Sequence, residues 1–170
     1  MPLDQPFFVV ATTSGYWEMT LQEMVVTANP AGLFEPLTLV SDAYGSSVTL
    51  AAPGYDSSLG VLGISVIAQG QCQQATGATL SITGLPPDAG PYHVIYLGNG
   101  TPSAAQSVTG AALPSAYAYN LPVGVDLSIA VTHPTCQQAP YPVAMNSLTY
   151  TGKVRVFPGG AASYALVFLQ

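Results

Sequence analysis

Two cysteines, Cys72 and Cys136, are the residues whose type and setting most clearly indicate chemistry in this sequence. Each begins a Cys-Gln-Gln triplet, and each follows a short run rich in β-branched residues, Gly63–Ala68 in one case and Asp126–Val131 in the other. We interpret this repeated strand-then-cysteine unit as one disulfide that ties two sheet ends together. Such a bond would indicate an oxidising compartment and would close a loop of roughly 65 residues. Two buried free thiols are the alternative.

Two histidines, His93 and His133, are the candidates for acid–base or metal chemistry. Nucleophilic catalysis needs a base beside a nucleophile, but His93 falls within an expected strand and the chain has no Gly-x-Ser-x-Gly motif. His133 stands in a Thr-His-Pro turn close to Cys136, where we expect it to cap a loop. A zinc site is not indicated, because there is no Cys-x-x-Cys pair. We therefore predict no catalytic residue, no metal centre and no enzymatic activity.

Two acids, Asp42 and Asp56, lie in expected loops, each close in sequence to a tyrosine, Tyr44 or Tyr55. Paired carboxylates can hydrolyse glycosides, but Asp also forms turns of this kind. Tyrosine is an amphipathic contact residue for sugars and proteins, so these four residues are the candidate ligand-binding set. The same loops, together with Glu35, could hold a calcium ion through oxygen ligands. No other cofactor is predicted.

Asn99 begins an Asn-Gly-Thr tripeptide, which is an N-glycosylation sequon. The same Asn-Gly pair is also a strong signal for a two-residue hairpin turn, because both residues tolerate positive φ. The turn accounts for these residues by itself. Glycosylation at Asn99 therefore stays open.

The charge composition excludes several classes of partner. Only 6% of the 170 residues are charged, the net charge is −6, and both cations lie near the end of the chain, at Lys153 and Arg155. A chain without a basic patch is not expected to bind nucleic acid or an anionic membrane. No apolar run reaches the length of about 18 residues that indicates a membrane span. We predict a protein that acts outside the cell or on its surface.

Frequent turn signals divide the chain into strand-sized runs and predict an all-β fold. The 17 glycines and 15 prolines leave little room for long helices. We expect an antiparallel β-sandwich, either one large sandwich or two small sandwiches packed together. Ser41–Gly45 is expected to be a turn, and Val48–Ala51 the strand after it. Gly15–Leu21 is expected to be a strand with Trp17, Met19 and Leu21 on one face, and Met24–Ala28 a further strand ended by a turn at Asn29–Gly32. A helix over Trp17–Val26 is the alternative.

Three further segments carry specific expectations. Tyr92–Leu97 is apolar on both faces, which predicts a central strand, with Asn99-Gly100 turning the chain into a return strand at Ser103–Val108. Ala116–Leu121 is expected to direct Tyr117, Tyr119 and Leu121 to the same buried face. Near the chain end, Lys153–Phe157 and Ser163–Leu169 are expected to form a hairpin turned by Pro158-Gly159-Gly160.

The second half of the chain resembles a known family. From Tyr117 to Val131 the sequence has paired aromatic residues, then Leu-Pro, Gly and an alternating Leu-x-Ile-x-Val run. This pattern resembles a segment of the carboxypeptidase-regulatory-like, prealbumin-type (transthyretin-type) β-sandwiches, and Thr83–Pro86 and Leu148–Leu169 are similar to their opening strands and last hairpin. The resemblance covers about residues 78–170. It implies a spacer, adhesive or accessory module, and it transfers no catalytic residue.

These observations predict two halves, an N-terminal β half at residues 1–76 and a prealbumin-like sandwich at 77–170. The expected function is a non-enzymatic structural subunit of a surface filament, coat or adhesin, which forms a homo-oligomer or polymer. The apolar terminal strands, Phe7–Ala11 and Tyr164–Leu169, could add to a neighbour's sheet; alternatively they pair within their own fold. A lectin-like module that binds carbohydrate is the alternative function. An export leader is expected to have been removed.

Overall fold

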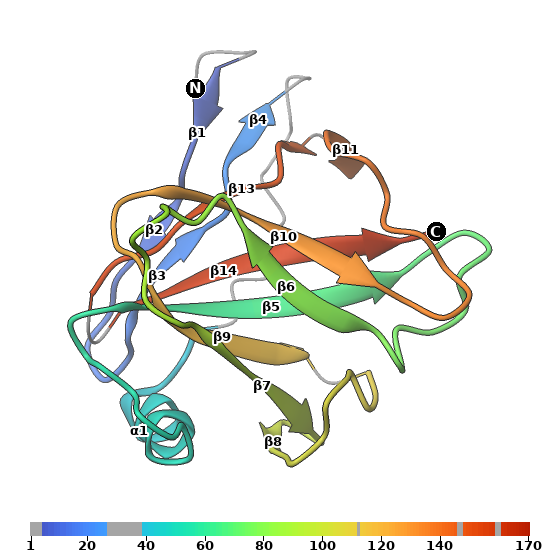
Figure 1. The fold of residues 1–170 in the computed structure, drawn as a ribbon. Helices are drawn as coiled ribbons and strands as arrows, with labels where there is room; N and C mark the ends of the chain where they lie inside the picture. The colour runs from blue at the N-terminus through green and yellow to red at the C-terminus, as the bar shows by residue number, and fades with distance from the viewer. Residues whose placement is uncertain (1–4, 27–38, 112, 146–147, 159–160) are drawn as a thin grey trace.

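The computed structural model describes residues 5–26, 39–111, 113–145, 148–158 and 161–170, which are mostly β. A seven-stranded sheet runs through the molecule in the order β2-β3-β14-β5-β9-β7-β8 (Figure 1). Its strands are β2 (Val10–Ala11), β3 (Glu18–Leu21), β14 (Ala161–Leu169), β5 (Gly60–Ala68), β9 (Ala116–Leu121), β7 (His93–Gly98) and β8 (Thr101–Pro102).

Two smaller sheets and one helix complete the described fold. The first small sheet has the order β13-β10-β6, and the second has the order β1-β4-β12-β11. Their bounds are β13 (Lys153–Arg155), β10 (Asp126–Thr132), β6 (Thr79–Thr83), β1 (Pro6–Phe7), β4 (Met24–Val26), β12 (Leu148–Tyr150) and β11 (Val143–Met145), and the helix is α1 (Asp42–Leu50). Within the described ranges, no helix has the length and apolar character that crossing a membrane requires.

Strand β14 lies inside the large sheet, and it corrects the expectation of a purely antiparallel fold. It pairs in parallel with β3 on one side, Ala161 opposite Glu18, and in parallel with β5 on the other, Leu169 opposite Ala68. All nine of its residues are buried. An unbroken apolar run is typical of a strand that is covered on both faces. Parallel pairing joins segments that are far apart in the chain, so local sequence patterns did not reveal it.

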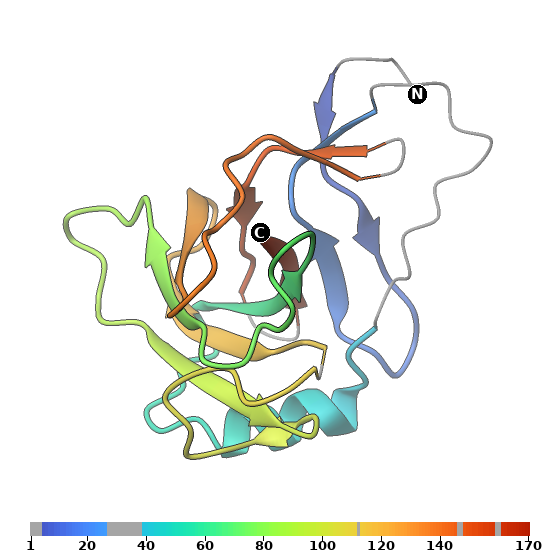
Figure 2. The ribbon, with the colours of Figure 1, turned by 90° about the vertical axis from the view of Figure 1, so that its right-hand side faces the viewer.

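The large sheet has a hydrophobic core on each face. The helix-side core lies against α1, β4 and β12 and takes Tyr164, Leu166 and Phe168 from β14. The disulfide-side core lies under the β13-β10-β6 sheet and takes Ala165, Val167 and Leu169. Successive side chains of a strand point to opposite faces, so β14 supplies both cores. Figure 2 shows α1 below the sheet and the two smaller sheets on its flanks.

Strands from both predicted halves pair in this sheet. Strand β5 belongs to residues 1–76, and it pairs with β9 and β14 from residues 77–170. The division into two halves is not tested by this pairing and stays a prediction. Residues 27–38 fall outside the described ranges, as do the expected turn at 29–32 and Glu35. The expected turn at 158–160 lies partly outside them.

Helix α1 corrects the expectation of a turn at Ser41–Gly45 and a strand at Val48–Ala51. The Ser41 side chain caps the helix by accepting a hydrogen bond from the Tyr44 backbone N–H at 3.3 Å, and Asp42 places an acid in the first turn. The glycine, serines and β-branched residues of this segment are poor helix formers, so its sequence concealed the helix. Gly45 is buried against the Trp17 ring, which lies where a Cβ on Gly45 would be placed.

The strand expectations near Trp17 and Asn99 are confirmed. Trp17, Met19 and Leu21 all belong to the helix-side core, so the helical alternative for this segment is wrong. Asn99 and Gly100 have φ of 51° and 79° and join β7 to β8, with Gly98 opposite Thr101. This is the predicted two-residue hairpin turn.

Several strand positions differ from expectation. β7 is next to the edge of its sheet instead of central, because only β8 follows it in the strand order. The predicted return strand at Ser103–Val108 is wrong: the chain returns as β8 at Thr101–Pro102, and residues 103–108 form a loop. Leu121 enters the disulfide-side core, whereas Tyr117 and Tyr119 enter the helix-side core. The cause is Asn120, whose φ of 61° accompanies a register shift against β5 and reverses the alternation.

The last two strands do not form the expected hairpin. β13 pairs with β10 in one small sheet, while β14 lies inside the large sheet. The two terminal segments pair within their own fold, since β1 pairs with β4, β2 pairs with β3, and β14 is enclosed by β3 and β5. Strand addition by the C-terminal strand is therefore ruled out for this fold.

We predict that Gly45→Ala lowers the free energy of unfolding by about 1–3 kcal/mol, because the new Cβ would overlap the Trp17 ring and overpack the core. Chemical denaturation followed by fluorescence measures this, and Trp17 is the one tryptophan in the chain. Ser46→Ala, at the adjacent exposed helix position, is the control and should change stability by less than about 0.5 kcal/mol. Equal stability of the two variants would contradict the packing of Trp17 on α1.

Candidate functional site

The predicted disulfide is present between Cys72 and Cys136, whose Cα atoms are 5.6 Å apart. Cys72 is buried in the loop after β5, and Cys136 is half-buried in the loop after β10, so the bond joins the large sheet to the β13-β10-β6 sheet. The C-terminus is held at the same end, where Gln137 and Gln170 exchange backbone hydrogen bonds of 3.0 and 2.9 Å. The disulfide therefore covalently links the two sheets that enclose the disulfide-side core.

His133 lies beside this disulfide and caps its loop, as the sequence predicted. Its Nδ1 accepts hydrogen bonds from the backbone N–H groups of Thr135 and Cys136, at 3.2 and 3.0 Å, and its Nε2 lies 3.0 Å from the Thr76 carbonyl oxygen. Cysteine, histidine, aspartate and glutamate side chains can ligate a metal ion. In the described part of the chain, the group of three such side chains that lie close enough together to share an ion is Cys72, His133 and Cys136. Both sulfurs are bonded to each other and both ring nitrogens are engaged, so this cluster is structural.

The four candidate ligand residues have roles in packing or in turns. Tyr44 lies on α1, where its hydroxyl donates to the Gly100 carbonyl at 2.7 Å and its ring lies 6.3 Å from that of Tyr117. The Tyr55 ring lies 6.5 Å from that of Tyr119. Burial raises the pKa of both hydroxyls, Tyr44 and Tyr55. Both tyrosines are half-buried, and their rings pack against tyrosines of β9 from the helix side of the sheet.

The two acids of that set are exposed and lie in different settings. Asp42 is in the first turn of α1. Asp56 forms a turn, because its carboxylate accepts from the backbone N–H and the hydroxyl of Ser58, at 2.8 and 2.7 Å, and these bonds lower its pKa. This is the turn role that the sequence offered as the alternative for Asp56. With Glu35 outside the described residues, the calcium and ligand roles of this set stay predictions.

A groove of about 780 Å³ is a feature that sequence reasoning missed. It follows the outer edge of β7 and reaches β6 on one side and the loop after α1 on the other. It is lined by uncharged side chains apart from one histidine. The lining residues are Ala51, Pro53, Thr79, Leu80, Tyr92, His93, Val94, Ile95, Tyr96, Pro102, Ser103, Ala105, Gln106 and Tyr119.

The floor of this groove includes an unpaired strand edge. On its inner side β7 pairs with β9 from His93 to Tyr96, but on its outer side it pairs with β8 only at Leu97 and Gly98. The Tyr96 carbonyl faces outward and accepts from the Ser103 N–H at 3.0 Å. Backbone groups of alternate residues point to the same edge of an antiparallel strand, so Val94 also directs its N–H and C=O outward. No described strand pairs with Val94 on that side.

The facing edge of β6 is closed by Tyr96 of β7 and by Tyr92, which immediately precedes β7. The Leu80 N–H donates to the Tyr96 hydroxyl at 2.8 Å, and the Ile82 N–H donates to the Tyr92 hydroxyl at 3.0 Å. Burial raises the pKa of Tyr96, so this hydroxyl stays neutral at physiological pH. Side-chain hydroxyls therefore replace a missing strand between β6 and β7 and satisfy backbone groups that would otherwise be buried without partners.

The chemistry of the groove suits binding. His93 stacks on Tyr119 with ring centroids 5.3 Å apart, and the Tyr119 hydroxyl donates to the Pro53 carbonyl at 3.1 Å. The Ser103 hydroxyl is already donating to the Tyr96 carbonyl at 3.0 Å. The groove thus offers aromatic faces and backbone groups to an uncharged extended chain. Alternating tyrosines in Tyr92–Tyr96, and a proline in the return strand, are the sequence signals that could have located it.

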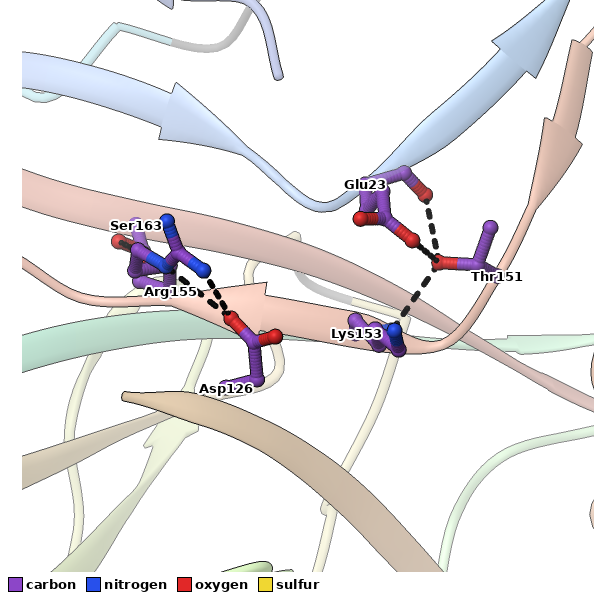
Figure 3. A network of polar contacts seen from close by, with 6 residues as sticks. All are labelled: Glu23, Asp126, Thr151, Lys153, Arg155 and Ser163. Atoms are coloured by element: carbon purple, nitrogen blue, oxygen red, sulfur yellow. Dashed lines mark hydrogen bonds and ion pairs between the residues drawn. The ribbon is translucent and has the colours of Figure 1, made fainter. Parts of the chain in front are cut away.

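A second polar cluster lies around the two cations and is structural (Figure 3). Arg155 binds the Asp126 carboxylate with N–O distances of 2.6 and 3.0 Å, in a pair that is partly exposed. Such a pair contributes at most about 1 kcal/mol. Beside it, the Thr151 hydroxyl donates to the Glu23 carboxylate at 2.8 Å, and the Glu23 N–H donates to the Lys153 carbonyl at 2.9 Å. These contacts hold β13 between β10 and the turn before β4.

No protein family, curated protein or solved structure matches this chain. The resemblance to prealbumin-type sandwiches therefore stays an interpretation of the sequence.

We predict that Tyr96→Phe lowers the free energy of unfolding by about 1–3 kcal/mol, because the buried Leu80 N–H would lose its acceptor. Urea denaturation measures the difference. Tyr16→Phe, at a tyrosine that is 44% exposed, is the control and should be close to wild type. A Tyr96→Phe variant as stable as this control would show that the hydroxyl does not cap β6.

We predict that Cys72→Ala/Cys136→Ala lowers the free energy of unfolding by on the order of 4 kcal/mol, through the lost loop closure. Denaturation of wild-type and variant protein measures the loss. The intact mass of wild-type protein that has not been reduced should be two hydrogen masses lower than that of the same protein after reduction. Two thiols that alkylate in natively purified protein, before any reduction, would contradict the bond.

Proposed function

We propose that this protein is a non-enzymatic structural subunit of a surface filament, coat or adhesin, built as a β-sandwich and working outside the cell. The disulfide between Cys72 and Cys136 supports an oxidising compartment. The low charged fraction of 6% supports a protein that works by contact surfaces and not by recognition of charged ligands. In this proposal, residues 77–170 correspond to the prealbumin-like module.

The observation that carries the proposal is the unpaired outer edge of β7. Monomeric β proteins usually protect an edge strand by a charge, a proline, a bulge or a covering loop. No Lys, Arg, Asp or Glu lines the groove at Val94, and although Pro102 and the loop after β8 form part of its wall, no described strand pairs with Val94 on that side. Association through this edge replaces the C-terminal strand as a route by which the subunit pairs with others, because β14 is already paired on both of its edges.

Carbohydrate binding is a second candidate because aromatic residues line the same groove. The His93–Tyr119 stack and the half-buried Tyr92 ring offer flat faces of the kind that sugars pack on. This location replaces the loop around Tyr44 and Tyr55, where the rings are occupied by β9. A glycan array separates the two candidates, since retention of one glycan class by a monomeric protein favours binding.

We predict that protein purified from its native source without reductant forms filaments, sheets or large closed particles. Negative-stain electron microscopy, with size-exclusion chromatography and light scattering over a range of concentrations, tests this. Reduced and alkylated protein is the control, and it should assemble less because the clip between the sheets is lost. A monomer at every concentration would overturn the structural role and leave the binding module.

A further inference from the structure

We infer that subunits associate head to tail, with the outer edge of β2 in one copy pairing with the outer edge of β7 in the next. The large sheet would then continue from molecule to molecule. This inference rests on the proposed structural function and names its partner, a second copy of this chain. Four observations lead to it.

The large sheet is open at both ends of its strand order. β2 is the last strand at one end and the β7–β8 hairpin lies at the other; Figure 1 shows β2 at the left of the molecule and the hairpin at its lower side. Every strand between them is paired on two sides. A neighbour that extends this sheet can therefore do so only at β2 or at the β7–β8 end.

The outer edge of β2 has free backbone groups at Val10. The Leu21 N–H donates to the Val9 carbonyl at 2.9 Å, so Val9 faces β3. Alternation then directs the N–H and C=O of Val10 away from β3. The side chain of Val10 is 53% exposed, which is high for a β-branched residue in a strand. Within the described ranges, no strand covers this edge.

The two edges suit each other in charge. Neither residue of β2 is charged, and no Lys, Arg, Asp or Glu lines the groove beside Val94. Arg155 lies over the nearby Phe8 ring, 5.6 Å from its centroid, but it is paired with Asp126. Edge strands of natural proteins commonly carry lysines against unwanted pairing. Here that protection is missing from both ends, although the net charge is −6.

The difference between the ends makes the contact directional. Val94 lies on the floor of a groove, whereas Val10 is exposed outside any described groove, so one copy supplies the exposed β2 edge and the next supplies the hollow. Contacts between unlike surfaces generate rings or open filaments instead of closed dimers. A second copy is therefore a sufficient occupant of the groove, since each chain carries the complementary edge.

Two charge-insertion variants test this contact, one at each end. Val10→Lys places a charge on the exposed β2 edge, and Gln106→Lys places one on an exposed residue of the groove wall. Each should raise the concentration for half-assembly by at least about tenfold, because a lysine would have to be desolvated in the contact. Val123→Lys, at an exposed valine outside both edges, is the matched control and should assemble like wild type.

Mixing the two variants provides the decisive measurement. Each retains one intact end, so an equimolar mixture should form a one-to-one heterodimer by sedimentation velocity and stop there. Unchanged assembly of Val10→Lys, or of Gln106→Lys, would overturn the head-to-tail contact while leaving a structural role intact. A wild-type protein that remains monomeric would overturn both. Circular dichroism and melting of each variant confirm that a loss of assembly is not a loss of folding.

Discussion

The fold depends on the burial of β14 on both faces and both edges. Its side chains alternate between two cores, and β5 pairs with it along most of its length. On the other edge β3 covers only the first part, and side chains complete the rest. Gln22 accepts from the Leu166 N–H and the Tyr141 hydroxyl donates to the Leu166 carbonyl, both at 2.8 Å. A strand without water on any side needs a partner for every backbone group.

This demand explains the surrounding architecture. Gln22 is almost fully buried because its amide stands in for the strand that β3 does not provide. Further along, the Ala139 N–H donates to the Phe168 carbonyl at 2.8 Å, which brings in the loop after Cys136. The disulfide therefore lies where the chain must return to cover the end of β14. Burial of the Tyr141 hydroxyl at this place raises its pKa to about 12, so it remains a neutral donor.

Because the inner strands of the large sheet are paired on both edges, the edges available for association are those at the two ends of the sheet. The edge of β6 is capped by the hydroxyls of Tyr92 and Tyr96, which accept hydrogen bonds from the backbone N–H groups of Ile82 and Leu80. The edge of β7 next to it is not capped, and the same two tyrosines form part of its groove. Tyr92 and Tyr96 thus cap the edge of β6 and also line the groove beside the edge of β7. Without charged residues at these places, backbone pairing and ring contacts are the interactions that the surface can offer.

The sequence by itself determined the properties that depend on local pattern. Alternation around Trp17 and the Asn99-Gly100 turn predicted the correct strand faces and hairpin, and the repeated Cys-Gln-Gln units predicted the disulfide. Tertiary structure decided the rest, because it depends on contacts between distant segments. Parallel pairing of β14, and the helix formed where Gly45 meets the Trp17 ring, have no local signature. The groove has none either, since it forms only where β6, β7 and the loop after α1 meet.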